Sequence, residues 1–151
     1  ERTPHLDAMA RGGWIGLTAK HTRADLIRAL LEGVSFSQMD CLAIIEELGV
    51  QVSCVRASGG GAKSAFWRQM LADIFNKRVV VLETQEGSAY GAALLAVAGT
   101  GEYSSVPEVC RVAIREVDSV SPRPEEAAAY ARFYEVFKAA YPAVKPLFPR
   151  M

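Results

Sequence analysis

Apolar residues recur at roughly helical spacing between residues 22 and 48. They are Leu26, Leu30, Val34, Met39, Leu42, Ile45 and Leu48. Such spacing places apolar side chains on one face of a helix. Thr22 can cap its amino end, Asp25 suits its first turn, and Gly49 suits its carboxyl end. The pattern predicts a long helix over 22–48.

Short segments rich in β-branched residues alternate with helical segments further along the chain. Residues 52–57 and 78–82 are predicted strands, because valine favours extended structure. The helix expected between them, over 63–76, has a broad apolar face. That face contains Phe66, Trp67, Met70, Leu71, Ile74 and Phe75. A further helix over 86–98 is rich in glycine, alanine and serine, so it could approach a neighbouring element closely.

The last third of the chain has weaker patterns. Residues 102–124 look irregular, with a short helix after Pro107 and a charged extended stretch near 112–117. A last helix over 125–141 should end near Pro142. The order of elements predicts an α/β fold with parallel strands flanked by helices and joined by a right-handed crossover. Two strands make a poor sheet, so we expect the remaining strands to lie upstream.

Composition narrows the function classes. The 151 residues suffice for one domain, and Lys+Arg and Asp+Glu both number 17, which disfavours a nucleic-acid partner. Three scattered cysteines suggest neither a disulfide framework nor a metal site, which favours a cytoplasmic protein; they are Cys41, Cys54 and Cys110. No apolar run approaches the roughly 20 residues that span a membrane. The chain begins without Met or signal-peptide features, so we expect it to be a piece of a longer protein.

The segment with most chemical content is SGGGAKS at 58–64, between a predicted strand and a predicted helix. Consecutive glycines permit positive φ angles and carry no Cβ, so a ligand can touch the main chain. The start of the next helix offers N–H groups and a positive dipole end. These features suit a phosphate or another polar part of a nucleotide. An ordinary tight turn is the alternative.

Two known glycine motifs fit poorly. A Walker A loop is G-x-x-x-x-G-K-[ST], and Ala57 and Ala62 stand at its two glycine positions, so we exclude a P-loop ATPase. A dinucleotide-binding fingerprint is G-x-G-x-x-G, whose third glycine is replaced by Ser64. A Rossmann oxidoreductase is therefore the weaker alternative.

Several runs resemble the carboxyl-terminal domain of FGGY carbohydrate kinases. Residues 59–73, GGGAKSAFWRQMLAD, resemble the adenosine-binding segment of that family. The runs GGWIGL at 12–17 and DLIRALLE at 25–32 resemble its carboxyl-domain signature. The run EGSAYGAA at 86–93 resembles its small-residue helix. The opening ERTPHLD is similar to a stretch typical of the xylulokinases within the family.

The resemblance implies part of an actin-like, ribonuclease-H-like fold that binds ATP between two domains and uses Mg²⁺. Residues 1–145 would form the carboxyl-terminal kinase domain, and 146–151 a tail. The catalytic aspartate, the phosphate loops and most sugar contacts would lie in the upstream region, so we name no catalytic residue and no metal ligand here. The implied reaction is phosphorylation of a ketopentose, D-xylulose to D-xylulose 5-phosphate, and this chain alone should be inactive.

The resemblance assigns only the nucleotide half of the site to this chain. The residues are Gly59, Gly60, Gly61, Lys63 and Ser64. The glycines would lie along ATP, Ser64 near the adenine, and Lys63 either near the ribose and phosphates or in solvent. Gln69 and Asp73 match the motif but could be structural, and Trp67 fits a core position better than a base-stacking one.

Three alternatives stay open at this point. The sugar could instead be gluconate, ribulose or glycerol. The protein could be a non-catalytic, actin-like nucleotide-binding module. An aromatic stripe on 125–141 is more consistent with packing, but an exposed stripe would favour a homodimer. His5 and His21 have no spaced partner for a metal or a nucleophile, so we expect them to be surface residues.

Overall fold

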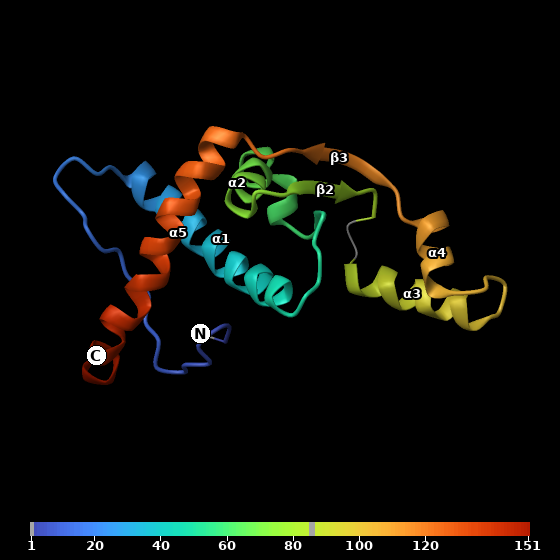
Figure 1. Ribbon diagram of the computed structural model, residues 1–151, viewed down its shortest axis with the longest axis horizontal. Coiled ribbons are helices and arrows are strands. Elements are labelled where there is room, and N and C mark those ends of the chain that lie inside the picture. Colours follow the sequence, from blue (N-terminus) through green and yellow to red (C-terminus); the bar gives the residue numbers. More distant parts are fainter. Residues whose placement is uncertain (1, 85–86) are drawn as a thin grey trace. The chain divides into compact units, whose positions relative to one another are not determined.

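The computed structural model describes residues 2–84 and 87–151 (Figure 1). The chain divides into two compact units, which are considered separately. The first contains Glu1–Val52, Asp73–Asn76 and Pro122–Met151, and the second contains Ser53–Ala72 and Lys77–Ser121. Glu1, the first residue of the ERTPHLD run, lies outside the described residues. So does Glu86, the first residue of the helix expected over 86–98.

In the first unit, helix α1 (Arg23–Glu47) confirms the helix predicted over 22–48. Thr22 and Asp25 form a reciprocal capping box: the Thr22 N–H donates to Asp25 Oδ2 over 2.7 Å, and the Asp25 N–H donates to Thr22 Oγ1 over 3.4 Å. These contacts satisfy donors that a helix start leaves unpaired. Past the other end, Gly49 has φ +88°, which glycine adopts without strain.

Helix α5 (Pro124–Val144) packs its aromatic residues against α1. Phe36 of α1 is buried and lies 5.4 Å, between ring centroids, from Phe137 and 5.8 Å from Tyr134. Tyr130 is buried, and its hydroxyl donates to Glu32. Most of the predicted aromatic stripe is therefore used in packing, although Phe133 is 60% exposed.

The carboxyl end differs in detail from the sequence prediction. Helix α5 does not end at Pro142 but continues to Val144, and the 3₁₀ segment η2 (Lys145–Arg150) follows. A proline removes one N–H donor, and the surrounding packing can compensate for that loss. Phe148 of η2 is buried beside Tyr141.

The second unit is built on three strands. Strands β1 (Cys54–Ala57) and β2 (Arg78–Leu82) are parallel, as predicted, with Cys54 opposite Arg78. Strand β3 (Glu116–Val120) pairs antiparallel with the other edge of β2. The charged extended stretch predicted near 112–117 overlaps only the start of this strand, and the expectation that all remaining strands lie upstream was wrong. The strand forms because β2 supplies the hydrogen-bonding partner that local sequence cannot reveal.

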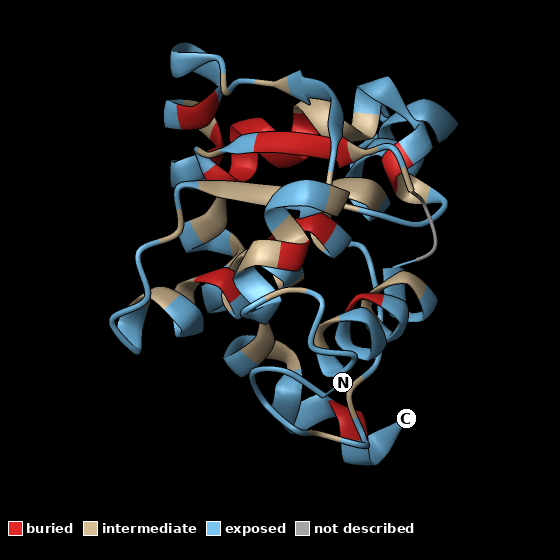
Figure 2. Cartoon of the chain, turned by 90° about the vertical axis from the view of Figure 1, so that its right-hand side faces the viewer, coloured by how far each residue is buried: buried red, intermediate tan, exposed pale blue. Residues whose placement is uncertain are grey.

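Helix α2 (Ala65–Phe75) makes the crossover between β1 and β2, preceded by the short 3₁₀ helix η1 (Gly61–Lys63). The middle of β2 is buried, with Val79 and Val80 both at 0% exposure (Figure 2). In the helix, Met70 and Leu71 are buried as expected, but Phe66 is 53% exposed. The core of this unit therefore centres on β2 and the middle of α2.

Two further helices complete this unit. They are α3 (Gly87–Gly99) and α4 (Val106–Ala113), which begins one residue before Pro107. They pack together, and the Tyr90 hydroxyl donates to the Ala113 carbonyl over 2.8 Å. A Cβ added at Gly91 would meet nothing within 4 Å, so among the described residues no neighbouring element approaches the helix closely at that position. Within the described part of the chain, every helix is too short or too polar to cross a membrane.

Candidate functional site

The glycine loop lies at the edge of the sheet where ligands of α/β proteins usually bind. Strands β1 and β2 are parallel, so their carboxyl ends meet at the same edge. Loop 58–64 follows β1, and α3 begins a few residues after β2. A Cβ added at Gly87 would lie 3.6 Å from Ser58 Oγ, so the start of α3 is beside the loop. Two helix starts and a glycine run thus share this edge.

The loop turns by one positive φ angle followed by a 3₁₀ turn. Gly59 has φ +80°, and the N–H groups of Ala62, Lys63 and Ser64 donate to the carbonyls of Gly59, Gly60 and Gly61. The sequence predicted free N–H groups at this helix start, but these three are already bonded within the loop. A ligand would therefore meet chiefly the exposed main chain of Gly59 and Gly60.

The three glycines are needed for three different reasons. Gly59 requires glycine because of its positive φ angle. Gly60 has φ −61°, which any residue adopts, and a Cβ there would meet nothing within 4 Å. A Cβ at Gly61 would lie 2.6 Å from the Trp67 ring. Of the three, only Gly60 has neither a φ angle nor a described neighbour that requires glycine, which leaves room for an approaching ligand.

Lys63 and Ser64 end the loop. Ser64 Oγ accepts a hydrogen bond from the Trp67 N–H over 3.3 Å, so this hydroxyl caps α2. A serine hydroxyl also has one hydrogen to donate, which leaves it suited to a polar ligand atom. Lys63 is exposed at the last position of η1. Both residues lie on the same short segment as the glycines.

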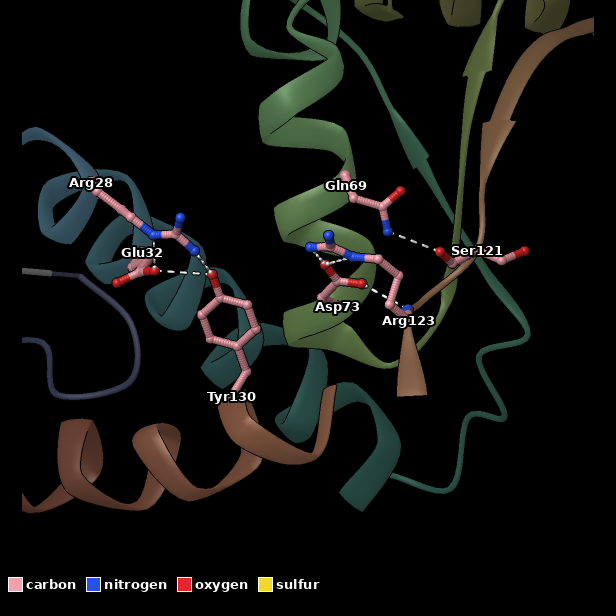
Figure 3. Close-up of polar contacts among 7 residues, drawn as sticks. All are labelled: Arg28, Glu32, Gln69, Asp73, Ser121, Arg123 and Tyr130. Atoms are coloured by element: carbon pink, nitrogen blue, oxygen red, sulfur yellow. Dashed lines mark hydrogen bonds and ion pairs between the residues drawn. The ribbon is translucent and has the colours of Figure 1, made fainter. Parts of the chain in front are cut away.

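Two other residues of the motif have structural contacts (Figure 3). Within the second unit, the Gln69 side chain donates to the Ser121 carbonyl over 3.0 Å. Within the first unit, Asp73 is fully buried and accepts from the Arg123 N–H over 2.8 Å and from its guanidinium Nη2 over 2.6 Å. This guanidinium has a raised pKa, chiefly because of the hydrogen bond to Asp73. These contacts favour the structural interpretation of both residues.

Arg68 was missed by the sequence analysis. Its Nη1 donates to the Ala62 carbonyl and its Nη2 to Asp118 Oδ2, both over 2.6 Å. The only local signal was an arginine beside an apolar helical stripe, which more often means a solvated side chain. Its partner Asp118 was not predictable, because it lies just beyond the extended stretch predicted near 112–117 and the pairing of β3 with β2 was not predicted.

Both histidines have partners within the described part of the chain. His5 stacks on Tyr141 with ring centroids 3.6 Å apart, and His21 Nδ1 lies 2.9 Å from the Thr18 amide nitrogen. In the described part of the chain, His, Cys, Asp and Glu form no group of three that could hold a metal ion.

Comparison with known proteins bears on the family and the fold. Residues 1–100 match the model of the FGGY family of carbohydrate kinases, C-terminal domain. A xylulose kinase of Staphylococcus epidermidis is 42% identical over 148 residues, which cover 97% of this chain and 30% of that protein. The chain thus spans about a third of the length of such relatives.

Two crystal structures have the same fold. Ligand-bound xylulose kinase of Lactobacillus acidophilus superposes with a TM-score of 0.91 at 29% identity, over 99% of this chain and 30% of that one. Gluconate kinase of the same organism superposes with a TM-score of 0.88 at 28% identity, over 96% and 29%. The fold is therefore the α/β, actin-like fold of these kinases, in part, and the chain belongs to the FGGY family of carbohydrate kinases.

Proposed function

We propose that this chain supplies the adenosine-binding half of a kinase that transfers a phosphoryl group from ATP to D-xylulose, giving D-xylulose 5-phosphate. The observation that carries the proposal is the open, exposed main chain of Gly60, a glycine that neither its φ angle nor its described neighbours require. Membership of a carbohydrate kinase family supports the chemistry.

The described loop fits an adenine nucleotide. Gly59 and Gly60 present main chain without side chains, and the Ser64 hydroxyl can donate to a ring nitrogen or a ribose oxygen. The Lys63 ammonium would lie near the ribose or the phosphates. ATP supplies the phosphoryl group, and this chain's residues hold and orient its nucleoside end.

Magnesium would be held elsewhere. Mg²⁺ in kinases is usually bound by one or two carboxylates together with substrate phosphates. We assign no residue of this chain to the metal or to proton abstraction from the sugar; both roles would belong to the upstream domain. We also propose that residues 1–145 form the carboxyl-terminal domain, that 146–151 form a tail, and that the protein is cytoplasmic.

The opening segment supports xylulose as the sugar, because ERTPHLD is typical of xylulokinases. In the structure this segment is attached to α5: Asp7 accepts a 2.5 Å hydrogen bond from the Tyr141 hydroxyl, beside the His5–Tyr141 stack. Gluconate is the second candidate, favoured by the close superposition on a gluconate kinase.

The test uses the full-length protein that carries these residues. ADP formation is measured with D-xylulose, D-gluconate, D-ribulose and glycerol, and kcat/KM should be highest for D-xylulose. Gly60→Val should raise the KM for ATP about tenfold or more, because a branched side chain would occupy the nucleotide's place.

Three results would contradict the proposal in different ways. A highest kcat/KM for gluconate would replace the substrate and keep the nucleotide site. An unchanged KM for ATP in folded Gly60→Val would remove the nucleotide site. ATP binding without phosphorylation of any sugar would favour a non-catalytic nucleotide-binding module.

A further inference from the structure

Arg68 joins the glycine loop to the edge strand β3. Its guanidinium donates to the Ala62 carbonyl in η1 and to the Asp118 carboxylate on β3, in each case over 2.6 Å. The Arg68 side chain is 13% exposed, and Ala62 is 4% exposed. The Ala62 end of the bridge is therefore shielded from water, where charge-assisted hydrogen bonds are stronger than at the surface, whereas the Asp118 carboxylate at the other end is 49% exposed.

A β-bulge places Asp118 in reach of Arg68. On β3, Asp118 pairs with Val81 and Glu116 pairs with Leu82, so Val117 is the extra residue. Paired residues point to the same face of a sheet, and consecutive residues of β2 point to opposite faces. Asp118 thus shares the Val81 face, on which it meets Arg68 of α2.

The same bulge sends Glu116 to the other face of the sheet. There it lies 3.2 Å from Arg78 Nη2 and 3.6 Å from Arg56 Nη2. Without the bulge, residues 116 and 118 would share one face. The bulge therefore places Glu116, with its ion pairs to Arg56 and Arg78, on one face of the sheet. It places Asp118, which binds Arg68 near the glycine loop, on the other face.

The Ala62 carbonyl sits within the turn that shapes the loop. The Ala62 N–H closes the turn by donating to the Gly59 carbonyl over 3.2 Å, and the Lys63 N–H donates to Gly60 over 3.2 Å. The Arg68 hydrogen bond to the Ala62 carbonyl thus stabilises this turn. That turn keeps the main chain of Gly59 and Gly60 open.

We infer that Arg68, anchored by Asp118, is a positioning residue for nucleotide binding: it holds loop 59–64 in the conformation that receives ATP. The inference rests on the proposed nucleotide site. Arg68 would contact no substrate and would act only through the Ala62 carbonyl. Its loss should therefore weaken ATP binding and leave sugar binding and the chemical step nearly unchanged.

The test measures steady-state kinetics of Arg68→Gln in the full-length protein that carries these residues. The matched control is Arg78→Gln, which makes the same chemical change and also breaks an ion pair to β3, but does not reach the loop. We expect the KM for ATP to rise about tenfold in Arg68→Gln, with kcat and the sugar KM within about twofold. Arg78→Gln should leave all three within about twofold.

A second readout needs no catalysis. In nucleotide-free protein, hydrogen exchange at the amides of Ala62, Lys63 and Ser64 should be faster in Arg68→Gln than in Arg78→Gln, because the turn would open more often. Arg68→Lys should restore part of the ATP affinity, since one ammonium can still donate to the Ala62 carbonyl.

Asp118→Asn decides the question if Arg68→Gln does not fold. It keeps an oxygen that can accept from Arg68 but loses the charge, and should raise the KM for ATP about threefold. The inference is overturned if neither variant raises this KM more than Arg78→Gln, or if the sugar KM rises equally. Gly60→Val distinguishes failure of the Arg68 role from failure of the nucleotide site. If Gly60→Val alone raises the KM for ATP, the nucleotide site stands and only the role of Arg68 fails. If it leaves that KM unchanged, the proposed site itself fails.

Discussion

The Asp73 carboxylate, at 0% exposure, accepts hydrogen bonds from both the main chain and the guanidinium of Arg123. Arg123 is the residue directly before α5, so the carboxylate fixes the point at which that helix begins. Asp73 lies in the segment that resembles the nucleotide-binding motif, yet its side chain binds a residue 50 positions further along the chain and has a structural role.

Replacing this carboxylate should destabilise the protein strongly. Asp73→Ala is expected to lower the free energy of unfolding by about 2 kcal/mol, because part-buried hydrogen bonds to a charged group are lost and α5 loses its anchor. Glu135→Ala is the control, since its ion pair with Lys138 is exposed and should contribute less than about 0.5 kcal/mol. Urea denaturation measures both, and equal losses would contradict the buried-anchor role.

Gly61 and Gly60 should respond very differently to alanine. Gly61→Ala should cost about 1–3 kcal/mol, because the new Cβ would lie 2.6 Å from the Trp67 ring. Gly60→Ala should change stability by less than about 0.5 kcal/mol, since its φ angle suits any residue and the space is open. Thermal denaturation followed by tryptophan fluorescence compares them. Trp67→Leu should relieve part of the Gly61→Ala defect, and a failure to do so would argue against this steric explanation.

The contact between Asp7 and Tyr141 should be visible in a pH titration. The hydrogen bond from the Tyr141 hydroxyl, helped by the Met9 N–H, holds the pKa of Asp7 below its ordinary value. A carboxylate with a lowered pKa in the folded state stabilises that state above the ordinary pKa, near 3.9, and loses this effect as pH falls through the lowered value.

Carbon-detected NMR of the carboxyl groups checks this relationship. Tyr141→Phe should shift the Asp7 midpoint upward, toward the ordinary value. The midpoint of Asp25 should stay low, because its pKa is lowered chiefly by the Thr22 N–H and not by Tyr141. An Asp7 midpoint that does not move in Tyr141→Phe would show that the hydroxyl is not its main partner.

The amino end of α1 offers a test of capping. Thr22→Ala should cost about 1 kcal/mol of stability, because the Asp25 N–H loses its acceptor. Thr22→Ser should restore most of it. Ser105 precedes α4 but caps none of its described N–H groups with its side chain, so Ser105→Ala should cost much less at that position. Chemical denaturation distinguishes these variants, and equal losses in Thr22→Ala and Ser105→Ala would exclude a specific capping effect.

The sequence alone determined the features that depend on near neighbours in the chain. Helix α1 with its cap, the succession of β1, glycine loop, α2 and β2, and the likeness to FGGY kinases all followed from local spacing and residue type. Capping and turn formation involve residues a few positions apart, so the sequence alone indicates where they occur.

Only the tertiary structure decided what depends on distant partners. Strand β3 has a charged sequence and forms because β2 offers a free edge, and its bulge then selects which carboxylate meets Arg68. Three glycines that look alike in sequence lie in different surroundings. Gly59 has a positive φ angle, Gly60 faces open space, and Gly61 lies against the Trp67 indole ring. Asp73 and Arg68 meet partners 50 positions away, and such pairings are set by the folded geometry rather than by local propensity.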